Sequence, residues 1–398
     1  MVYYEQVNNQ FDKYSFILNQ EVSGSIPLGY GVAYQQGLWW SGKYSFILNQ
    51  EVSSSIPLGY GVAFVRDRFT PQCGYRTPDG KPKKNSIRRD EVVRLIDSIQ
   101  SSSFSGEPLN FTERIIWFTS SMTCRSVFGQ VLKEQEVFIK LIREVISLTE
   151  GFDVADIFPS YKFLHGFGGA KKKLLNAHRK VDSIVEDVIK EHKKNLATRK
   201  SDDAIGGEDL VDVLLRLMND KSLQFPINND NIKAVIIDLF AAGTETSSTT
   251  TVWAMDEMFK NPTLLSKAQA KFRENDVEDL KYLKLVIKET LRIHAPIPLL
   301  VPREYNAESF KPERFEECSM DFVGNNFEFL PFGGGRRICP GISFGLANIY
   351  LSLAQLLYHF DWKLPTGMEP RYLDLTELSG ITASRKGDLY LSVTPYEP

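Results

Sequence analysis

The stretch of chain that most limits the possible folds runs from Asn229 to Lys260. Its apolar residues are spread around every face of a helix instead of forming one stripe, as seen at Ile232, Val235, Ile236, Leu239, Phe240 and Ala241. At about 1.5 Å per residue, such a helix is roughly 48 Å long. Because a helix that is apolar all round needs protein on every side, the sequence predicts a central buried helix with other elements packed around it.

The remaining periodic segments are mostly helical as well. Apolar residues at helical spacing, with polar residues between them, predict helices over residues 90–100, 112–129, 171–200, 280–294 and 341–360. The fourth of these ends before Ala295-Pro296, since the residue that precedes a proline disfavours the α conformation. Only residues 388–394 alternate as a strand does. We therefore expect a mainly α fold with a minor β region.

The N-terminal segment has a different character. Residues 13–33 return almost unchanged as residues 43–63. Stacked repeat folds need three or more units to bury a core, so we expect a locally duplicated segment and not a repeat fold. The stretch rich in Pro, Gly and Lys that follows is typical of a linker. We therefore divide the chain into an atypical segment, residues 1–84, and a main domain, residues 85–398.

Composition excludes several classes of function. The chain has 47 Lys and Arg against 50 Asp and Glu, a net charge of −3, so it lacks the basic excess of a nucleic-acid-binding protein. Its four cysteines contain no CxxC pair, which disfavours a disulfide framework or a zinc finger and favours a reducing compartment. The start lacks the pattern of a signal peptide, and no run of residues predicts a membrane span. We expect a soluble or peripheral protein.

The strongest chemical signal is PFGGGRRICPG, at residues 331–341, where glycines and arginines lead to Cys339 and Pro340 opens a helix. A cysteine at this place meets the positive end of the helix dipole and free N–H groups, which both favour the thiolate. The glycines would let the backbone approach a flat ligand, and the arginines could neutralise its acid groups. This pattern favours a thiolate ligand to haem iron, and an unreactive cysteine in a turn is the alternative.

The second signal lies within the central helix, where Ala242-Gly243-Thr244-Glu245-Thr246 begins a dense run of hydroxyl residues. Glycine and hydroxyl side chains weaken a helix interior, so a functional bulge is expected here. Ala242 and Gly243 leave room beside the helix for a small ligand, while Glu245 and Thr246 supply an acid and an alcohol able to pass protons. Hydroxyls that bond back to the carbonyls of their own helix are the alternative.

A third pattern is a glutamate and an arginine three residues apart, Glu289 and Arg292, with Arg314 further along in PERF. By itself this spacing usually means a surface ion pair.

A serine hydrolase is the rival function, because residues 341–345 fit G-x-S-x-G with Ser343 as nucleophile. That site needs a strand before the serine and then an acid and a histidine after it. His359 is the only histidine downstream and no acid lies between them, so this function is disfavoured. HExxH and P-loop motifs are also missing from the sequence.

Taken together, these residues resemble the cytochrome P-450 family of haem-thiolate monooxygenases, and plant sesquiterpene hydroxylases in particular, over about residues 85–398. The family pattern F-x-x-G-x-R-x-C-x-G is matched by Phe332, Gly335, Arg337, Cys339 and Gly341. The resemblance implies that Cys339 is the iron ligand of haem b and that Arg337 contacts a haem propionate. Arg303 stands where members often place a second propionate contact.

The resemblance also gives roles to the other motifs. Residues 242–246 match the oxygen-activation motif, with Ala242 and Gly243 beside the haem and with Glu245 and Thr246 as its catalytic acid–alcohol pair. The structural salt-bridge triad of the family would be formed by Glu289, Arg292 and Arg314. An apolar run would line part of the substrate pocket, although a packed core strand fits that run equally well: Ala295, Ile297, Leu299, Leu300 and Val301.

The activity implied by this resemblance is the insertion of one oxygen atom from O2 into a C–H bond of a small hydrophobic substrate, a sesquiterpene. Electrons would come from NADPH through NADPH–cytochrome P-450 reductase, at the cytosolic face of the endoplasmic reticulum membrane.

The sequence also departs from the family. We expect the N-terminal membrane anchor of the family to be absent, and only residues 305–309 stand between Arg303-Glu304 and Phe310, where members carry strands and a helix. We therefore expect a cytochrome P-450 fold that is incomplete at the N-terminus and in the β region before PERF. Two hypotheses follow: a working monooxygenase, or a catalytically inactive product of a rearranged gene whose missing elements leave apolar surface uncovered.

Overall fold

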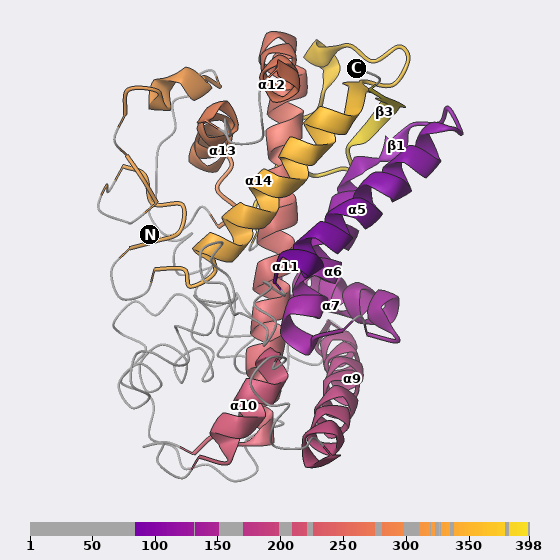
Figure 1. The fold of residues 1–398 in the computed structure, drawn as a ribbon, viewed down its shortest axis with the longest axis vertical. Helices are drawn as coiled ribbons and strands as arrows, with labels where there is room; N and C mark the ends of the chain where they lie inside the picture. Colours follow the sequence, from indigo (N-terminus) through magenta and orange to yellow (C-terminus); the bar gives the residue numbers. More distant parts are fainter. Residues whose placement is uncertain are drawn as a thin grey trace. The chain divides into compact units, whose positions relative to one another are not determined.

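The computed structural model describes residues 84–130, 132–150, 170–198, 209–220, 226–274, 281–297, 310–318, 320–322, 326, 328–334, 338–378 and 382–396. The duplicated segment lies outside these residues, and so do three of the expected site residues, Arg303, Gly335 and Arg337. The described part is mainly helical with a small antiparallel sheet, which confirms the predicted fold class (Figure 1).

The α-helices of the described part are α5 (Lys84–Ser103), α6 (Phe111–Phe128), α7 (Gln135–Glu150), α9 (Ala170–Thr198), α10 (Leu210–Met218), α11 (Asn229–Lys260), α12 (Pro262–Glu274), α13 (Lys281–Ile293) and α14 (Ile342–His359). Short 3-10 helices cover Pro312–Phe315 and Pro370–Tyr372. The five helices predicted besides α11 are present, with α5 longer than expected. Among the described residues, no helix combines the length and apolarity needed to cross a membrane.

The central helix α11 has the predicted bounds and the predicted environment. Residues 247–259 are all buried, and so are Ile232, Val235, Ile236 and Phe240 in its first half. It ends just before Asn261-Pro262, because proline cannot continue the hydrogen-bond ladder of a helix, and the same proline then opens α12.

Three helices were not predicted: α7, α10 and α12. Helix α10 has nine residues, seven of them buried, and it is too short for its pattern to stand out in a window of about 11–18 residues. Its start is fixed by Asp209, whose side chain accepts a hydrogen bond from the backbone N–H of Asp212 at 3.0 Å.

The sheet has three strands in the order β1 (Leu109–Asn110), β3 (Tyr390–Pro395) and β2 (Phe360–Lys363), and both pairings are antiparallel. Strand β3 corresponds to the strand predicted at residues 388–394. Strand β2 follows α14 directly and buries Phe360 and Trp362 on one face, as the alternation of a strand requires. The Trp362 ring meets Phe111 edge to face, with the ring centroids 5.5 Å apart.

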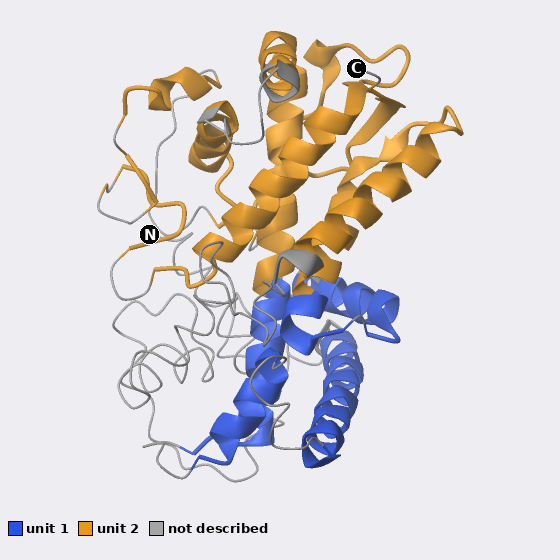
Figure 2. Cartoon of the chain, in the orientation of Figure 1, with its two compact units in different colours: residues 1–64, 124–241 blue, residues 65–123, 242–398 orange. Residues whose placement is uncertain are grey.

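The chain divides into two compact units (Figure 2). The described residues of the first lie within 124–241, and its core includes three packed aromatic rings, Phe128, Phe138 and Phe240. The described residues of the second lie within 65–123 and 242–398 and include the sheet, α12, α13 and α14. The second unit therefore contains every described residue of the expected haem site.

Candidate active site

Cys339 lies in a tight loop that leads into α14. A turn closes from the N–H of Gly333 to the carbonyl of Leu330 at 3.1 Å, and Gly333 has a φ of 71°, which a glycine adopts without strain. The N–H of Cys339 donates to the carbonyl of Phe332 at 2.9 Å, which closes the loop. Gly341 then caps α14, so the cysteine stands just before a helix N-terminus, as predicted.

Two opposing effects act on the acidity of Cys339. Burial raises the pKa of the Cys339 thiol, although hydrogen bonds from the backbone N–H groups of Gly341 and Ile342 act in the opposite direction. The N–H groups at the helix end act in the expected direction, but desolvation of the buried sulfur outweighs these two amide donors. The two donors are nevertheless aimed at the sulfur, which suits a thiolate once a metal cation replaces the proton.

The hydroxyl-rich part of α11 is an uninterrupted α-helix, so the expected bulge is not present. Four of its hydroxyls bond back to carbonyls of the same helix, and among them Thr246 Oγ1 donates to the carbonyl of Ala242 at 2.6 Å. Thr244 Oγ1 is buried and makes no such bond. Similar bonds join Ser248 to Glu245, Thr250 to Thr246 and Thr251 to Ser247. Through these bonds the hydroxyl groups find hydrogen-bond acceptors within α11, and the helix is not interrupted.

Helix α14, which begins shortly after Cys339, crosses α11 at the hydroxyl-rich motif (Figure 1). A Cβ atom built on Gly243 would lie 3.5 Å from Thr123 Oγ1 and 3.9 Å from the ring of Phe344. One turn along α11, Ser247 Oγ lies 3.5 Å from the Cβ position of Gly345. Small residues at this crossing therefore allow close approach of the two helices.

Gly243 therefore packs against α6 and α14 in the direction of its missing side chain, and it is partly buried overall. Ala242, Glu245 and Thr246 are only partly buried, unlike the sequence of fully buried residues that follows them in α11. Ala242 and Thr246, one turn apart, thus share a side of α11 that the described residues do not fully cover.

The structure also brings together the three residues of the expected triad. Arg292 makes a two-point contact with Glu289, with Nε and Nη2 each 2.8 Å from a carboxylate oxygen. Arg314 Nε and the backbone N–H of Lys311 donate to the same carboxylate at 3.0 and 2.9 Å. Glu289 has no exposed surface, so its charge is compensated entirely by these donors.

This arrangement fits a haem. Cys339 would supply the sulfur ligand, Phe332 and Gly341 flank it in the same loop, and the amides of Gly341 and Ile342 would hold the thiolate charge. Three further expected residues lie outside the described part of the chain: the two expected propionate contacts, Arg337 and Arg303, and also Gly335.

The serine hydrolase site does not form. Ser343 lies in the first turn of α14, and the described residues just before it, 338–341, form a turn and no strand. His359 lies at the far end of α14 and bonds to Gln355 at 3.2 Å. A strand-to-helix elbow with a nearby histidine is therefore not built here.

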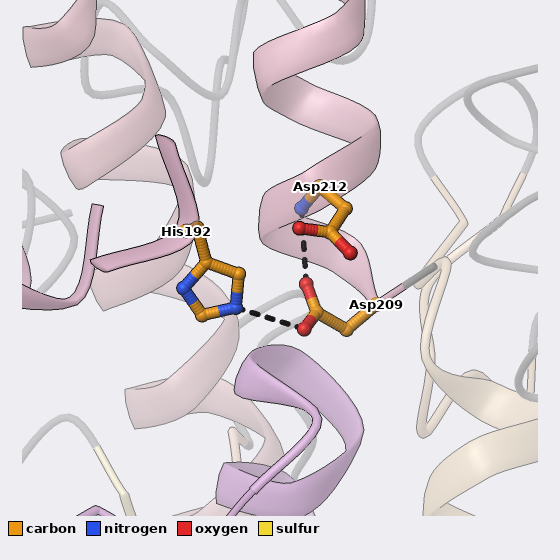
Figure 3. A group of neighbouring side chains, drawn as sticks. All are labelled: His192, Asp209 and Asp212. Atoms are coloured by element: carbon orange, nitrogen blue, oxygen red, sulfur yellow. Dashed lines mark hydrogen bonds and ion pairs between the residues drawn. The ribbon is translucent and has the colours of Figure 1, made fainter. Parts of the chain in front are cut away.

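A different group in the first unit has the composition of a metal site, namely His192, Asp209 and Asp212 (Figure 3). His192 Nε2 lies 2.8 Å from Asp209 Oδ2, and its Nδ1 lies 2.9 Å from the carbonyl of Val188. Both neighbours can only accept, so both ring nitrogens donate and the ring is an imidazolium. Although burial opposes the charge, the hydrogen bond and the charge of Asp209 raise the pKa of His192 to about 9. A proton therefore already occupies the place that a metal ion would take.

A second buried histidine, His294, was not predicted from the sequence, and its two nitrogens lie 2.9 Å from Glu257 and from Glu377. A signal was present, since Asp256 and Glu257 stand side by side in a helix that was expected to be buried on every side. Charged residues in such a helix require buried partners.

Comparison with known proteins agrees with this site. A sequence model of the family described as Cytochrome P450 matches residues 63–307 and 305–390. The two parts of the match meet at residues 305–307, where the sequence predicted missing elements, and this confirms that prediction.

Several curated proteins are similar to this chain. A cytochrome P450 71D7 of Solanum chacoense is 77% identical over 356 residues, which cover 79% of this chain and 71% of that protein. For 5-epiaristolochene 1,3-dihydroxylase of Nicotiana tabacum the identity is 70%, with the same coverage. For premnaspirodiene oxygenase of Hyoscyamus muticus it is 65%, covering 79% of this chain and 70% of that protein. The chain therefore belongs to the cytochrome P450 family, and by class it is a haem-dependent monooxygenase.

Proposed function

We propose that this protein hydroxylates a sesquiterpene hydrocarbon, inserting one oxygen atom from O2 into a C–H bond. Two relatives that are 70% and 65% identical are named as a dihydroxylase of epiaristolochene and as premnaspirodiene oxygenase, which supports this class of substrate. Electrons would come from NADPH through NADPH–cytochrome P450 reductase. The reaction would take place at the cytosolic face of the endoplasmic reticulum membrane.

In this proposal Cys339 ligates the iron of haem b, and Arg337 and Arg303 contact its propionates. When bound, the haem supplies the activation of molecular oxygen that no amino-acid side chain provides. The observation that carries the proposal is the loop of Cys339, whose sulfur faces two backbone N–H groups next to the crossing of α14 and α11. These donors hold negative charge on the sulfur and fix its direction.

Thr246 and Glu245 would manage the protons of the reaction. Thr246 Oγ1 donates its proton to the carbonyl of Ala242, so its lone pairs are free to accept a hydrogen bond from a water molecule or another donor. Such an acceptor holds one water in place, and the neighbouring carboxyl of Glu245 can exchange protons with solvent.

The substrate would lie against the segment that follows α13. Pro296 is buried, while Ala295 and Ile297 on either side of it are only half-buried. Buried prolines fix a backbone, and half-buried apolar side chains beside them provide a hydrophobic wall for a hydrocarbon.

The test is the carbon-monoxide difference spectrum of the reduced, haem-loaded protein, which reports thiolate ligation by a strongly red-shifted Soret band. We expect this band in the parent chain and in the control variant Cys318→Ser, which changes a half-buried cysteine outside the Cys339 loop. Cys339→Ser should lose it. Persistence of the band in Cys339→Ser would overturn the assignment of the ligand. Its absence from the parent chain would favour the inactive product of a rearranged gene.

A further inference from the structure

A group of charged side chains is buried in the second unit, behind the segment that follows α13. It joins Asp256 and Glu257 near the end of α11 to His294, which directly follows α13, and to Glu377 and Arg385 in the segment before β3. Asp256 has no exposed surface, and Glu257 and His294 are each 6% exposed. So many charged groups away from water need a compensating arrangement, because each alone would be costly to bury.

His294 is the centre of this group. Its Nε2 lies 2.9 Å from Glu257 Oε1 and its Nδ1 lies 2.9 Å from Glu377 Oε1. Ionised carboxylates only accept, so both nitrogens donate and the ring carries a positive charge. Burial disfavours that charge, but the two hydrogen bonds outweigh burial and raise the pKa of His294. The ring also stacks on Trp253, with the ring centroids 4.0 Å apart.

A second ion pair completes the compensation. Arg385 Nε lies 2.9 Å from Asp256 Oδ2, although the two groups are not aligned for a hydrogen bond. Burial raises the pKa of Asp256 to about 7, with Arg385 and His294 opposing that shift. Residues 377 and 385 face each other across an antiparallel bridge, so Glu377 and Arg385 close the group from one side.

Two backbone turns are tied to this group. Trp253 Nε1 donates to the carbonyl of Ala383 at 2.9 Å, and the N–H of Ala383 donates to the carbonyl of Pro296 at 2.9 Å. The position of Pro296 is therefore fixed on one side by His294, two residues earlier, and on the other by Ala383. A rigid support of this kind holds a binding surface to within fractions of an ångström.

We propose that His294 is a positioning residue for the substrate: held between Glu257 and Glu377, it fixes the turn of Ala295–Ile297 against Ala383. This inference rests on the proposed function, in which Ala295 and Ile297 form part of the hydrocarbon wall. His294 touches neither substrate nor haem. It acts on which C–H bond of the substrate is oxidised, and not on haem binding.

The first test compares the haem-loaded proteins His294→Gln and His359→Gln. His359 is the matched control, because it is a histidine at the end of a helix that contacts Gln355 and no carboxylate in the described part. We expect both to keep the thiolate Soret band. Only His294→Gln should change the ratio of hydroxylated products from a sesquiterpene hydrocarbon, by about tenfold, since small displacements of a bound substrate change rates strongly.

A pH series gives a second readout. The product ratio of the parent protein should shift as the pH rises through the raised pKa of His294, and His294→Gln should lack this shift. An unchanged product ratio and an unchanged pH profile in His294→Gln would overturn the proposal. If His294→Gln does not fold, Glu377→Gln serves instead, because Glu377 is 44% exposed and its amide keeps one hydrogen-bond acceptor.

Hydrogen–deuterium exchange separates this proposal from the proposed function. Amides of residues 295, 297 and 382–384 should exchange at least about tenfold faster in His294→Gln than in the parent, as expected for local opening. This measurement needs neither haem nor turnover. Unchanged exchange overturns the positioning role even in an active enzyme. If the parent protein shows no turnover but the variant exchanges faster, the sesquiterpene function is overturned, whereas the role of His294 in supporting the turn is retained.

Discussion

At the scale of single residues, Thr246 combines a structural and a chemical property. Its hydroxyl proton is used within α11, in the bond to the carbonyl of Ala242, and its oxygen remains able to accept. The two readings of the hydroxyl cluster, back-bonded side chains or a proton path, are therefore compatible. The same residue can do both, because a hydroxyl has one proton and two lone pairs.

Thr246→Ala should keep the thiolate Soret band but uncouple oxygen use from product formation, because the acceptor that holds water is removed. Product formed per NADPH consumed should fall about tenfold or more, and Thr246→Ser should restore most of it. Thr251→Ala, which removes a back-bonded hydroxyl one turn further along α11, is the control. Full coupling in Thr246→Ala would remove the proton role.

Glu289 belongs to a sequence pattern that usually marks a surface ion pair, but here its carboxylate is buried and accepts hydrogen bonds from several donors. Glu289→Ala should lower the free energy of unfolding by about 3–5 kcal/mol, because it removes the buried carboxylate that pairs with both Arg292 and Arg314. Glu369→Ala breaks an exposed ion pair with Arg371, and it should change the free energy of unfolding by less than about 1 kcal/mol. Urea unfolding measures both, and equal effects would contradict the role of burial.

At the scale of elements, α9 and α10 are joined by a buried charge pair, since His192 lies in α9 and Asp209 caps α10 (Figure 3). The pKa of His192 is raised on folding, to about 9. A raised pKa stabilises the fold below the unfolded value of about 6.5, and the stabilisation disappears as the pH rises through the folded value.

The urea midpoint of the parent protein should therefore fall between pH 7 and pH 10 through loss of this pair. Asp209→Asn keeps a capping acceptor but removes the charge, so it should lower the midpoint at pH 7 and leave little further loss from this pair at pH 10. At pH 7, Asp209→Ala should lower the free energy of unfolding by about 1 kcal/mol more than Asp209→Asn does, because the cap of α10 is lost as well. An equal pH dependence in Asp209→Asn and the parent would contradict this account.

At the scale of the whole molecule, haem binding should be linked to stability. A ligand that binds only the folded protein stabilises it by about 2.7 kcal/mol at a hundred times its dissociation constant. Haem should therefore raise the midpoint of thermal unfolding of the parent and of Cys318→Ser, and raise that of Cys339→Ser clearly less. The same rise in all three would mean that haem binding does not depend on the sulfur of Cys339.

Several features of the fold and of the site were predictable because they depend on residues that are near one another in the chain. The bounds of α11 follow from its apolar pattern and from Pro262, and the start of α14 follows from Cys339-Pro340-Gly341. The family followed from the order and spacing of short motifs. Helix α10 was missed because nine residues are too few to show a helical period clearly.

The sequence by itself determined the helical class, the central helix, the cysteine loop and the family, since periodicity, proline and glycine act locally. Only the tertiary structure decided the net acidity of Cys339, the packing at Gly243 and the charged state of His192 and His294. The physical reason is that desolvation and charge pairing depend on groups far apart in the chain. Glu257, His294 and Glu377 become neighbours only when the second unit is folded.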